Sequence, residues 1–235
     1  MATFLDRYRK GEYVQVWSEL FEYGDRVRQE PILSDALAVA RETMLRVRTN
    51  IERLIPRLVE IGYQFDYPEL VYKLPKSEDT ERLYELNKLT GPLPLSFQAC
   101  YEMIGSVFLM GTHPMWKNYF EKDFLHDPLV ILPIEWGLQE FHQEYQYWQS
   151  GETEPFQFPL APDNFHKSNI SGGEDYSMIL PNSSVDAVLC GERHCTTFVN
   201  YLRISFQWGG FPGFETCETY PQEAISYLTE GLLPF

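Results

Sequence analysis

The sequence predicts an α+β protein in which a helical N-terminal region precedes a part that mixes helices and short strands. Apolar residues within positions 1–67 recur every three or four residues, which is the period of an amphipathic helix. Residues 81–235 show two helical segments, several short strand-like runs and a further helical segment. We therefore divide the chain into a helical region at 1–67, a linker at 68–80 and an α+β domain at 81–235.

The helices of the N-terminal region have recognisable end signals. Two short amphipathic segments end at Gly11 and Gly24, where glycine is placed as a C-terminal cap. A longer helix follows, with Ser34 as the expected N-cap and Gly62 as the expected stop. Pro56 lies inside this helix, and we expect it to kink the helix or end it early because proline lacks an N–H.

One face of the longer helix is apolar along its length. A coiled coil would need charged residues on both sides of this face, but mainly Arg41 and Arg48 flank it and Ile55 is apolar. The pattern therefore favours packing within the chain. Its residues are spaced alternately three and four apart and form one stripe: Leu37, Ala40, Met44, Val47, Ile51, Leu54, Leu58 and Ile61.

The second part begins after a connection. The segment from Phe65 to Thr80 has two prolines and scattered charge, which is typical of a linker. Two helices are then predicted, TERLYELNKLTG and LPLSFQACYEMIG, each ended by glycine. Short strands are predicted in SVFLMG, PLVILPI, YSMILP and DAVLC because turn residues bound them. Helical spacing returns at 197–206 in TFVNYLRISF.

Composition points to an acidic globular protein. The 235 residues are 44% hydrophobic and 15% aromatic, which excludes disorder, yet the net charge is −15. No run approaches the roughly 20 apolar residues of a membrane span. The charged start MATFLDRYRK also lacks the apolar core of a signal peptide. We therefore expect a cytoplasmic protein that does not bind membranes.

The acidity is concentrated in the second part of the chain. Residues 1–67 hold 10 Lys and Arg against 11 Asp and Glu, whereas residues 68–235 hold 9 against 23. A domain of this charge suits a basic protein partner, because opposite charge speeds association. Direct binding of nucleic acid is not expected, since glutamates are interleaved among the arginines of the long helix: Arg41, Arg46, Arg48, Arg53 and Arg57.

Several segments of the second part stand in a characteristic order. The first runs from Leu93 to Pro114, LPLSFQACYEMIGSVFLMGTHP, and combines a Leu-Pro start, a helix with a central aromatic residue and a strand ended by glycine. DPLVILP from Asp127, YSMILP from Tyr176 and TTFVNYLRISFQWGGFPGF follow. This order resembles the SUKH superfamily, a group of mostly bacterial α+β domains. The resemblance leaves the N-terminal helices aside.

The SUKH resemblance implies a binding role. Members of this superfamily are associated with immunity proteins of polymorphic toxin systems and, in fungi, with a cell-wall regulator. The family shares no catalytic motif that could be assigned to residues of this chain. The resemblance therefore implies a scaffold for protein partners without indicating which face binds.

Residues with reactive side chains do not form a catalytic or metal-binding pattern. The cysteines are expected to be free thiols, and the pair Cys190 and Cys195 in CGERHC lacks the second pair that a zinc site needs. His194 adjoins Cys195, but neighbouring side chains of a strand diverge. We therefore expect no enzyme activity, no cofactor and no metal. The remaining histidines lack the i, i+4 spacing of a helical metal pair: His113, His126, His142 and His166.

The aromatic segment QWGGFPGFE is the first candidate binding segment. Its glycines and Pro212 follow a helix and fit a helix stop with a tight turn. Its rings either pack on the sheet or face a partner, because aromatic residues rimmed by acids are typical of interface hot spots. The candidate residues are Trp208, Phe211, Phe214 and Glu215.

Acidic residues around the turn SGGED form the second candidate. Asp163, Glu174 and Asp175 are predicted to attract a basic partner. The two glycines precede a strand instead of opening a helix, so we interpret them as a turn and not as a phosphate-binding loop.

Two functions remain open. The first is an immunity-type protein that neutralises a basic toxin, for example a nuclease, by competing for its nucleic-acid-binding surface. The alternative is a regulatory or assembly protein that binds a partner or a second copy through its N-terminal helices, in which case the acidic charge would only maintain solubility.

Overall fold

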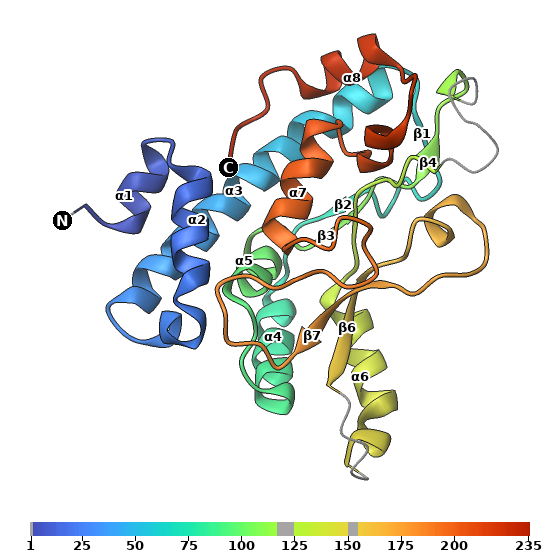
Figure 1. The fold of residues 1–235 in the computed structure, drawn as a ribbon. Helices are drawn as coiled ribbons and strands as arrows, with labels where there is room; N and C mark the ends of the chain where they lie inside the picture. The colour runs from blue at the N-terminus through green and yellow to red at the C-terminus, as the bar shows by residue number, and fades with distance from the viewer. Residues whose placement is uncertain (1, 117–124, 150–154) are drawn as a thin grey trace.

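The computed structural model describes residues 2–116, 125–149 and 155–235, and it has the α+β architecture that the sequence predicts. Helices dominate the first part of the chain (Figure 1). Small antiparallel sheets packed with helices make up the rest.

The N-terminal region consists of four helical segments. They are α1 (Phe4–Arg9), α2 (Tyr13–Glu22), the 3-10 helix η1 (Gly24–Arg28) and α3 (Ile32–Glu60). The ends of α1 and α2 fall just before Gly11 and Gly24, and both glycines have positive φ angles, so these two stop signals are confirmed.

The expected N-cap of α3 was wrong, and so was an early end of this helix at Pro56. The helix begins at Ile32 after Pro31, so Ser34 lies in its first turn and is not the N-cap. Its hydroxyl donates instead to the carboxylate of Glu30. Pro56 lies inside the helix, which continues to Glu60. A helix buried along one face loses only one backbone hydrogen bond at a proline, and its packing compensates for that loss.

The apolar stripe of α3 is covered within the chain, as the spacing predicts. Helices α1, α5 (Leu95–Met103) and α8 (Gln222–Thr229) pack against α3, which runs through the molecule between α1 and α8 (Figure 1). Leu37 and Ile61 at the two ends of the stripe are partly buried. The other six are fully buried: Ala40, Met44, Val47, Ile51, Leu54 and Leu58.

The polar side of α3 binds the C-terminal segment of the chain. Asn50 is buried and exchanges two hydrogen bonds with the backbone of Leu233, at 2.9 Å and 2.7 Å. Arg53 donates to the carbonyl of Gly231, and Arg57 donates to the carbonyl of Glu230, each at 2.6 Å. The chain terminus is therefore fixed along the same helix that organises the core.

The remaining helices follow the expected order with additions. α4 (Ser77–Thr90), α5 and α7 (Phe198–Gln207) correspond to predicted helices, while α6 (Ile134–Gln149) and α8 were not predicted. One continuous core joins residues of the N-terminal helices to those of the later elements, including Met44, Phe97 and Phe158.

The strands within the described ranges form three small antiparallel sheets. β1 (Gln64–Phe65) pairs with β4 (Gly111–Thr112), and β3 (Ser106–Phe108) lies between β2 (Tyr72–Lys73) and β5 (Val130–Ile131). β6 (Phe156–Ala161) pairs with β7 (Tyr176–Leu180). The predicted run DAVLC makes only isolated bridges, Ser177 with Cys190 and Val188 with Thr197.

The segment predicted as a linker is part of the folded structure. β2 lies within it, and α4 begins at Ser77 inside the same range. Gly105 shows how closely β2 is packed, because a side chain there would collide with the carbonyl of Lys73. Residues 68–80 therefore connect the two parts through strand pairing.

We expect the substitution Met44→Asp to lower the free energy of unfolding by about 4 kcal/mol or more, because it buries an unpaired charge in the stripe. Leu45→Asp is the matched control, since Leu45 is 45% exposed on the same helix. Chemical denaturation of both variants measures the difference. Equal effects of the two substitutions would contradict the burial of the stripe.

Candidate functional site

The two phenylalanines of the aromatic segment belong to the core. Phe211 and Phe214 are fully buried and pack against the ring of Trp116, with centroid distances of 4.9 Å and 5.2 Å. Because no part of either ring reaches the surface, they are not contact residues for a partner in this conformation. Of the two alternatives for the rings of QWGGFPGFE, packing inside the protein therefore holds for these two residues.

The other two candidate residues of this segment, Trp208 and Glu215, remain accessible to solvent. Trp208 is half-buried and packs edge-on against Tyr220, with ring centroids 5.1 Å apart. Glu215 is exposed at the 3-10 helix η4 (Pro212–Thr216) and forms an ion pair with Arg193 at 2.9 Å. Trp208 and Glu215 can therefore contact another molecule.

The aromatic core borders a surface cavity of about 490 Å³. None of the predicted site residues lines it. The lining combines His113, Met115 and Trp116, which follow β4, with residues of the α8 start and its preceding turn: Tyr220, Pro221, Gln222, Glu223 and Ala224.

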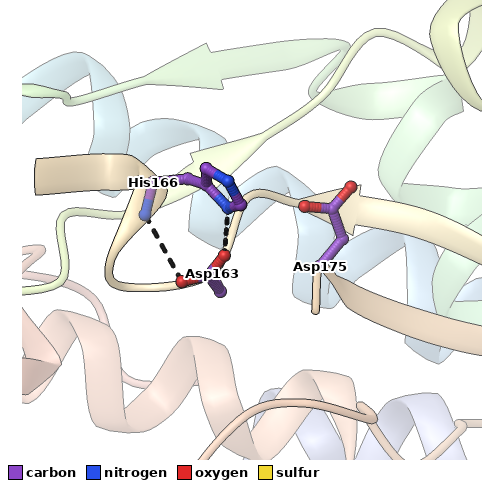
Figure 2. Close-up of side chains that lie close together, drawn as sticks. All are labelled: Asp163, His166 and Asp175. Atoms are coloured by element: carbon purple, nitrogen blue, oxygen red, sulfur yellow. Dashed lines mark hydrogen bonds and ion pairs between the residues drawn. The ribbon is translucent and has the colours of Figure 1, made fainter. Parts of the chain in front are cut away.

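The acidic residues of the second candidate differ in exposure. Glu174 is exposed and Asp175 is half-buried, whereas Asp163 is only 3% exposed. Asp163 is therefore not a surface charge that a partner could contact, because the turn around it covers its carboxylate. The structure adds His166 to this group (Figure 2).

Asp163 and His166 lie at the start of the 3-10 helix η3 (His166–Ser168). One carboxylate oxygen of Asp163 accepts the backbone N–H groups of Phe165, at 2.7 Å, and of His166, at 3.3 Å. The other oxygen is in direct contact with Nδ1 of the His166 ring. An aspartate two or three residues before such donors is typical of an Asx-type turn, so DNFH is a local signal for this geometry.

Asp175 approaches Asp163 from the far end of the glycine-rich turn. Gly173 has φ = 100°, and a side chain there would collide with the Asp163 carboxylate, so the turn requires glycine. Burial raises the pKa of Asp175; His166 opposes this shift, the like charge of Asp163 adds to it, and Lys167 also opposes it. Within the described ranges Asp175 has neither a hydrogen bond nor an ion pair through its carboxylate.

A buried ion pair involves Lys167, the residue that follows His166 in the chain. The Lys167 side chain is fully buried, and its Nζ is 2.6 Å from Oδ1 of Asp127. The hydroxyl of Tyr176 donates to Oδ2 of Asp127 at 3.1 Å. Nζ of Lys167 also lies 4.3 Å from the centre of the Tyr176 ring. These contacts satisfy both charges, which is what burial of an ion pair requires.

A second histidine with two carboxylates lies in the loop at 190–195. Nδ1 of His194 contacts Glu192, which is 2% exposed, and Nε2 contacts Glu215. The two carboxylates therefore lie on opposite edges of the ring, and Arg193 neutralises Glu215. This arrangement satisfies charge within the protein.

Cys100 and Cys195 do not meet a base in the described part of the chain. Cys100 is fully buried, and burial raises the pKa of its thiol. Cys195 is exposed, but both ring nitrogens of the adjacent His194 contact carboxylates. Neither cysteine has the partner that an activated nucleophile needs.

Sequence reasoning missed His166, Lys167 and Asp127. The histidine was considered only for pairing with other histidines, and the lysine and aspartate were counted as surface charge. The pair of Lys167 and Asp127 joins segments 40 residues apart, which no local pattern shows, whereas the local signal DNFH was available for His166.

Comparison with protein-family models, with curated proteins and with solved structures gives no match for this chain. The resemblance to the SUKH superfamily therefore remains a prediction from the sequence. None of the helices in the described ranges combines the length and the apolar character needed to cross a bilayer.

The ion pair of Lys167 and Asp127 can be tested by a double-mutant cycle. We expect Lys167→Met or Asp127→Asn alone to lower the free energy of unfolding by about 3 kcal/mol, because each leaves one buried charge unpaired. Asparagine tolerates the positive φ of 48° at position 127, so the backbone should not be strained. The double variant should lose less than the sum of the two. Additive losses in urea denaturation would contradict the coupling.

His126 predicts a pH dependence of stability. Burial lowers its pKa to about 4, whereas an unfolded histidine titrates near 6.5. Between these values the unfolded chain binds more protons, so stability should fall as the pH decreases from about 6.5 to about 4, by at most about 1.4 kcal/mol per pH unit. His126→Gln should remove this part of the dependence, and His142→Ala, at an exposed position, should not. Parallel pH profiles of wild type and His126→Gln would refute the assignment.

Proposed function

We propose that this chain is a non-catalytic binding protein whose acidic surface engages a basic protein. In its most specific form the proposal is an immunity-type protein that neutralises a basic toxin, for example a nuclease. The sequence resemblance to the SUKH superfamily supports that form, since members of this superfamily are associated with toxin immunity.

The observation that carries the proposal is how the chain uses its positive charges. Arg41, Arg46 and Arg48 form ion pairs with Glu102, Glu42 and Glu52. Arg53 and Arg57 donate to carbonyls of the C-terminal segment. In the second part, Arg82, Lys167 and Arg193 also form ion pairs with acids. The arginines of α3 are therefore engaged within the protein and not held free for phosphate.

Many acids of the second part remain on the surface. A net charge of −14 in residues 68–235 thus extends into solvent, where it attracts cationic partners over about one Debye length. A basic nuclease must bind phosphates, so its active face would be the natural target of this surface. The exposed acids there include Glu69, Glu78, Glu81, Glu85, Glu135, Glu174, Glu215, Glu218, Glu223 and Glu230.

Glu174 and Glu215 border one continuous surface. The loop at 190–195 connects them, because Gly191 packs against the backbone carbonyls of Glu174 and Asp175 while Arg193 pairs with Glu215. We therefore propose the contact surface at these two glutamates and at the exposed Glu218 that follows Glu215 in the chain, with Trp208 as a candidate aromatic contact.

The alternative function is a regulatory or assembly protein that binds through its N-terminal helices, and one observation in its favour no longer holds. The stripe of α3 that could have docked a partner is buried against α1, α5 and α8. A truncated chain without residues 1–67 would not show which region binds a partner. The truncation would expose the shared core and therefore disturb folding. A regulatory role would have to use a different surface of the N-terminal helices.

Charge reversal on the full chain tests the proposal. The wild-type chain and the double variant Glu174→Lys/Glu218→Lys are each used to capture proteins from native cells, and the captured proteins are compared. Glu22→Lys, at an exposed position of α2, is the control. We expect a basic protein that the double variant retains poorly. Its association rate with wild type should fall several-fold as salt rises from about 0.05 to 0.5 M, since the Debye length shrinks from roughly 14 to 4 Å.

Association and dissociation rates distinguish binding that depends on surface charge from binding that depends on packed side-chain contacts. We expect the double variant to associate several-fold more slowly than Glu22→Lys, with little change in dissociation rate. Association that is independent of salt, or a retained partner without excess positive charge, would refute the proposal.

A further inference from the structure

The group of Asp163, His166 and Asp175 differs from an ordinary cluster of surface acids. It combines one imidazole with two carboxylates, and one ligand atom from each lies within 4.8 Å of the other two. One of the carboxylates, Asp163, is buried. His166 faces Asp163, and Asp175 approaches from the neighbouring segment (Figure 2).

No lysine or arginine in the described ranges forms an ion pair with the carboxylates of this group. Within the described ranges Asp163 forms an ion pair only with His166, which is charged only when protonated, and Asp175 forms none. The ammonium of Lys167, which follows His166 in the chain, is buried and bound to Asp127; it lowers the pKa of Asp175 less than His166 does. Two carboxylates of like charge are thus held together without a permanent cation.

The second histidine cluster provides an internal comparison. At His194 the carboxylates contact opposite ring nitrogens, and Arg193 already neutralises one of them. The ligand atoms there cannot converge on one ion. At His166 the carboxylates lie close enough to share a single ion with the ring.

We propose that Asp163, His166 and Asp175 form a binding site for a divalent transition-metal ion such as Zn²⁺. Imidazole nitrogen and carboxylate oxygen are ligands that Zn²⁺ accepts, whereas Ca²⁺ and Mg²⁺ prefer oxygen ligands alone. Three protein ligands leave at least one position for water or for a side chain of a partner. This inference does not depend on the proposed function.

The geometry requires only small movements. Ligands about 2.1 Å from a tetrahedral zinc ion lie about 3.4 Å apart, and here they lie within 4.8 Å. The His166 side chain is 47% exposed and can rotate, while the backbone N–H groups of Phe165 and His166 fix the Asp163 carboxylate. In binding, the ion would take the place of the direct contact between Nδ1 of His166 and the Asp163 carboxylate.

Calorimetric titration of the full chain with ZnCl₂ tests this site, after chelator treatment and without a histidine tag. We expect one equivalent of Zn²⁺ to bind wild type. His166→Ala and Asp175→Asn should each weaken binding at least tenfold. The matched controls are His142→Ala, which removes another exposed histidine, and Glu174→Gln, which neutralises the acid beside Asp175; both should bind as wild type.

Melting curves without metal separate ligation from folding. His166→Ala should melt within a few degrees of wild type, because the ring is half exposed, yet it should lose the stabilisation that Zn²⁺ gives to wild type. Absence of binding to wild type would overturn the proposal. So would equal affinity of wild type, His166→Ala and Asp175→Asn, which would place the ion elsewhere.

Discussion

The burial of one face of α3 is the interaction on which the rest of this structure depends. A helix of 29 residues with an apolar stripe cannot leave that stripe in water, and α1, α5 and α8 cover it from three different parts of the chain. The first and last helices therefore share one core with the middle of the sequence. Since the C-terminal segment also hydrogen-bonds to Asn50, Arg53 and Arg57, the helix fixes both the interior and the chain end.

This organisation explains why an acidic surface can coexist with a chain that is nearly neutral over its first 67 residues. The arginines of α3 are used for contacts inside the protein, because their positions on the polar side place them beside carbonyls and glutamates of packed elements. The excess of acids in the later segments has no comparable set of cations to pair with. Net charge is then a property of the exposed surface, where it acts on solubility and association rather than on the fold.

The sequence predicted what depends on short range. The period of the α3 stripe, the stops at Gly11 and Gly24 and the strand at YSMILP all follow from local spacing and turn residues. It did not predict β2, because a two-residue strand inside a proline-containing segment is defined only by its partner Val107. Of the seven predicted site residues, Phe211, Phe214 and Asp163 are buried, since the sequence could not show what packs over them. Ser34 failed as an N-cap because the helix could begin directly after Pro31.

The segment from Asp163 to Tyr176 links the interior of the protein to its candidate site. Lys167 is anchored in the core by Asp127 and Tyr176, and this fixes the orientation of η3. In a 3-10 turn consecutive side chains point about 120° apart, so an inward lysine directs the preceding His166 outward, where it meets Asp163. Tyr176 opens β7 and is adjacent to Asp175, so the same anchor also places the second carboxylate. The buried ion pair thus determines the geometry of the three residues above it, although none of its own atoms belongs to their group.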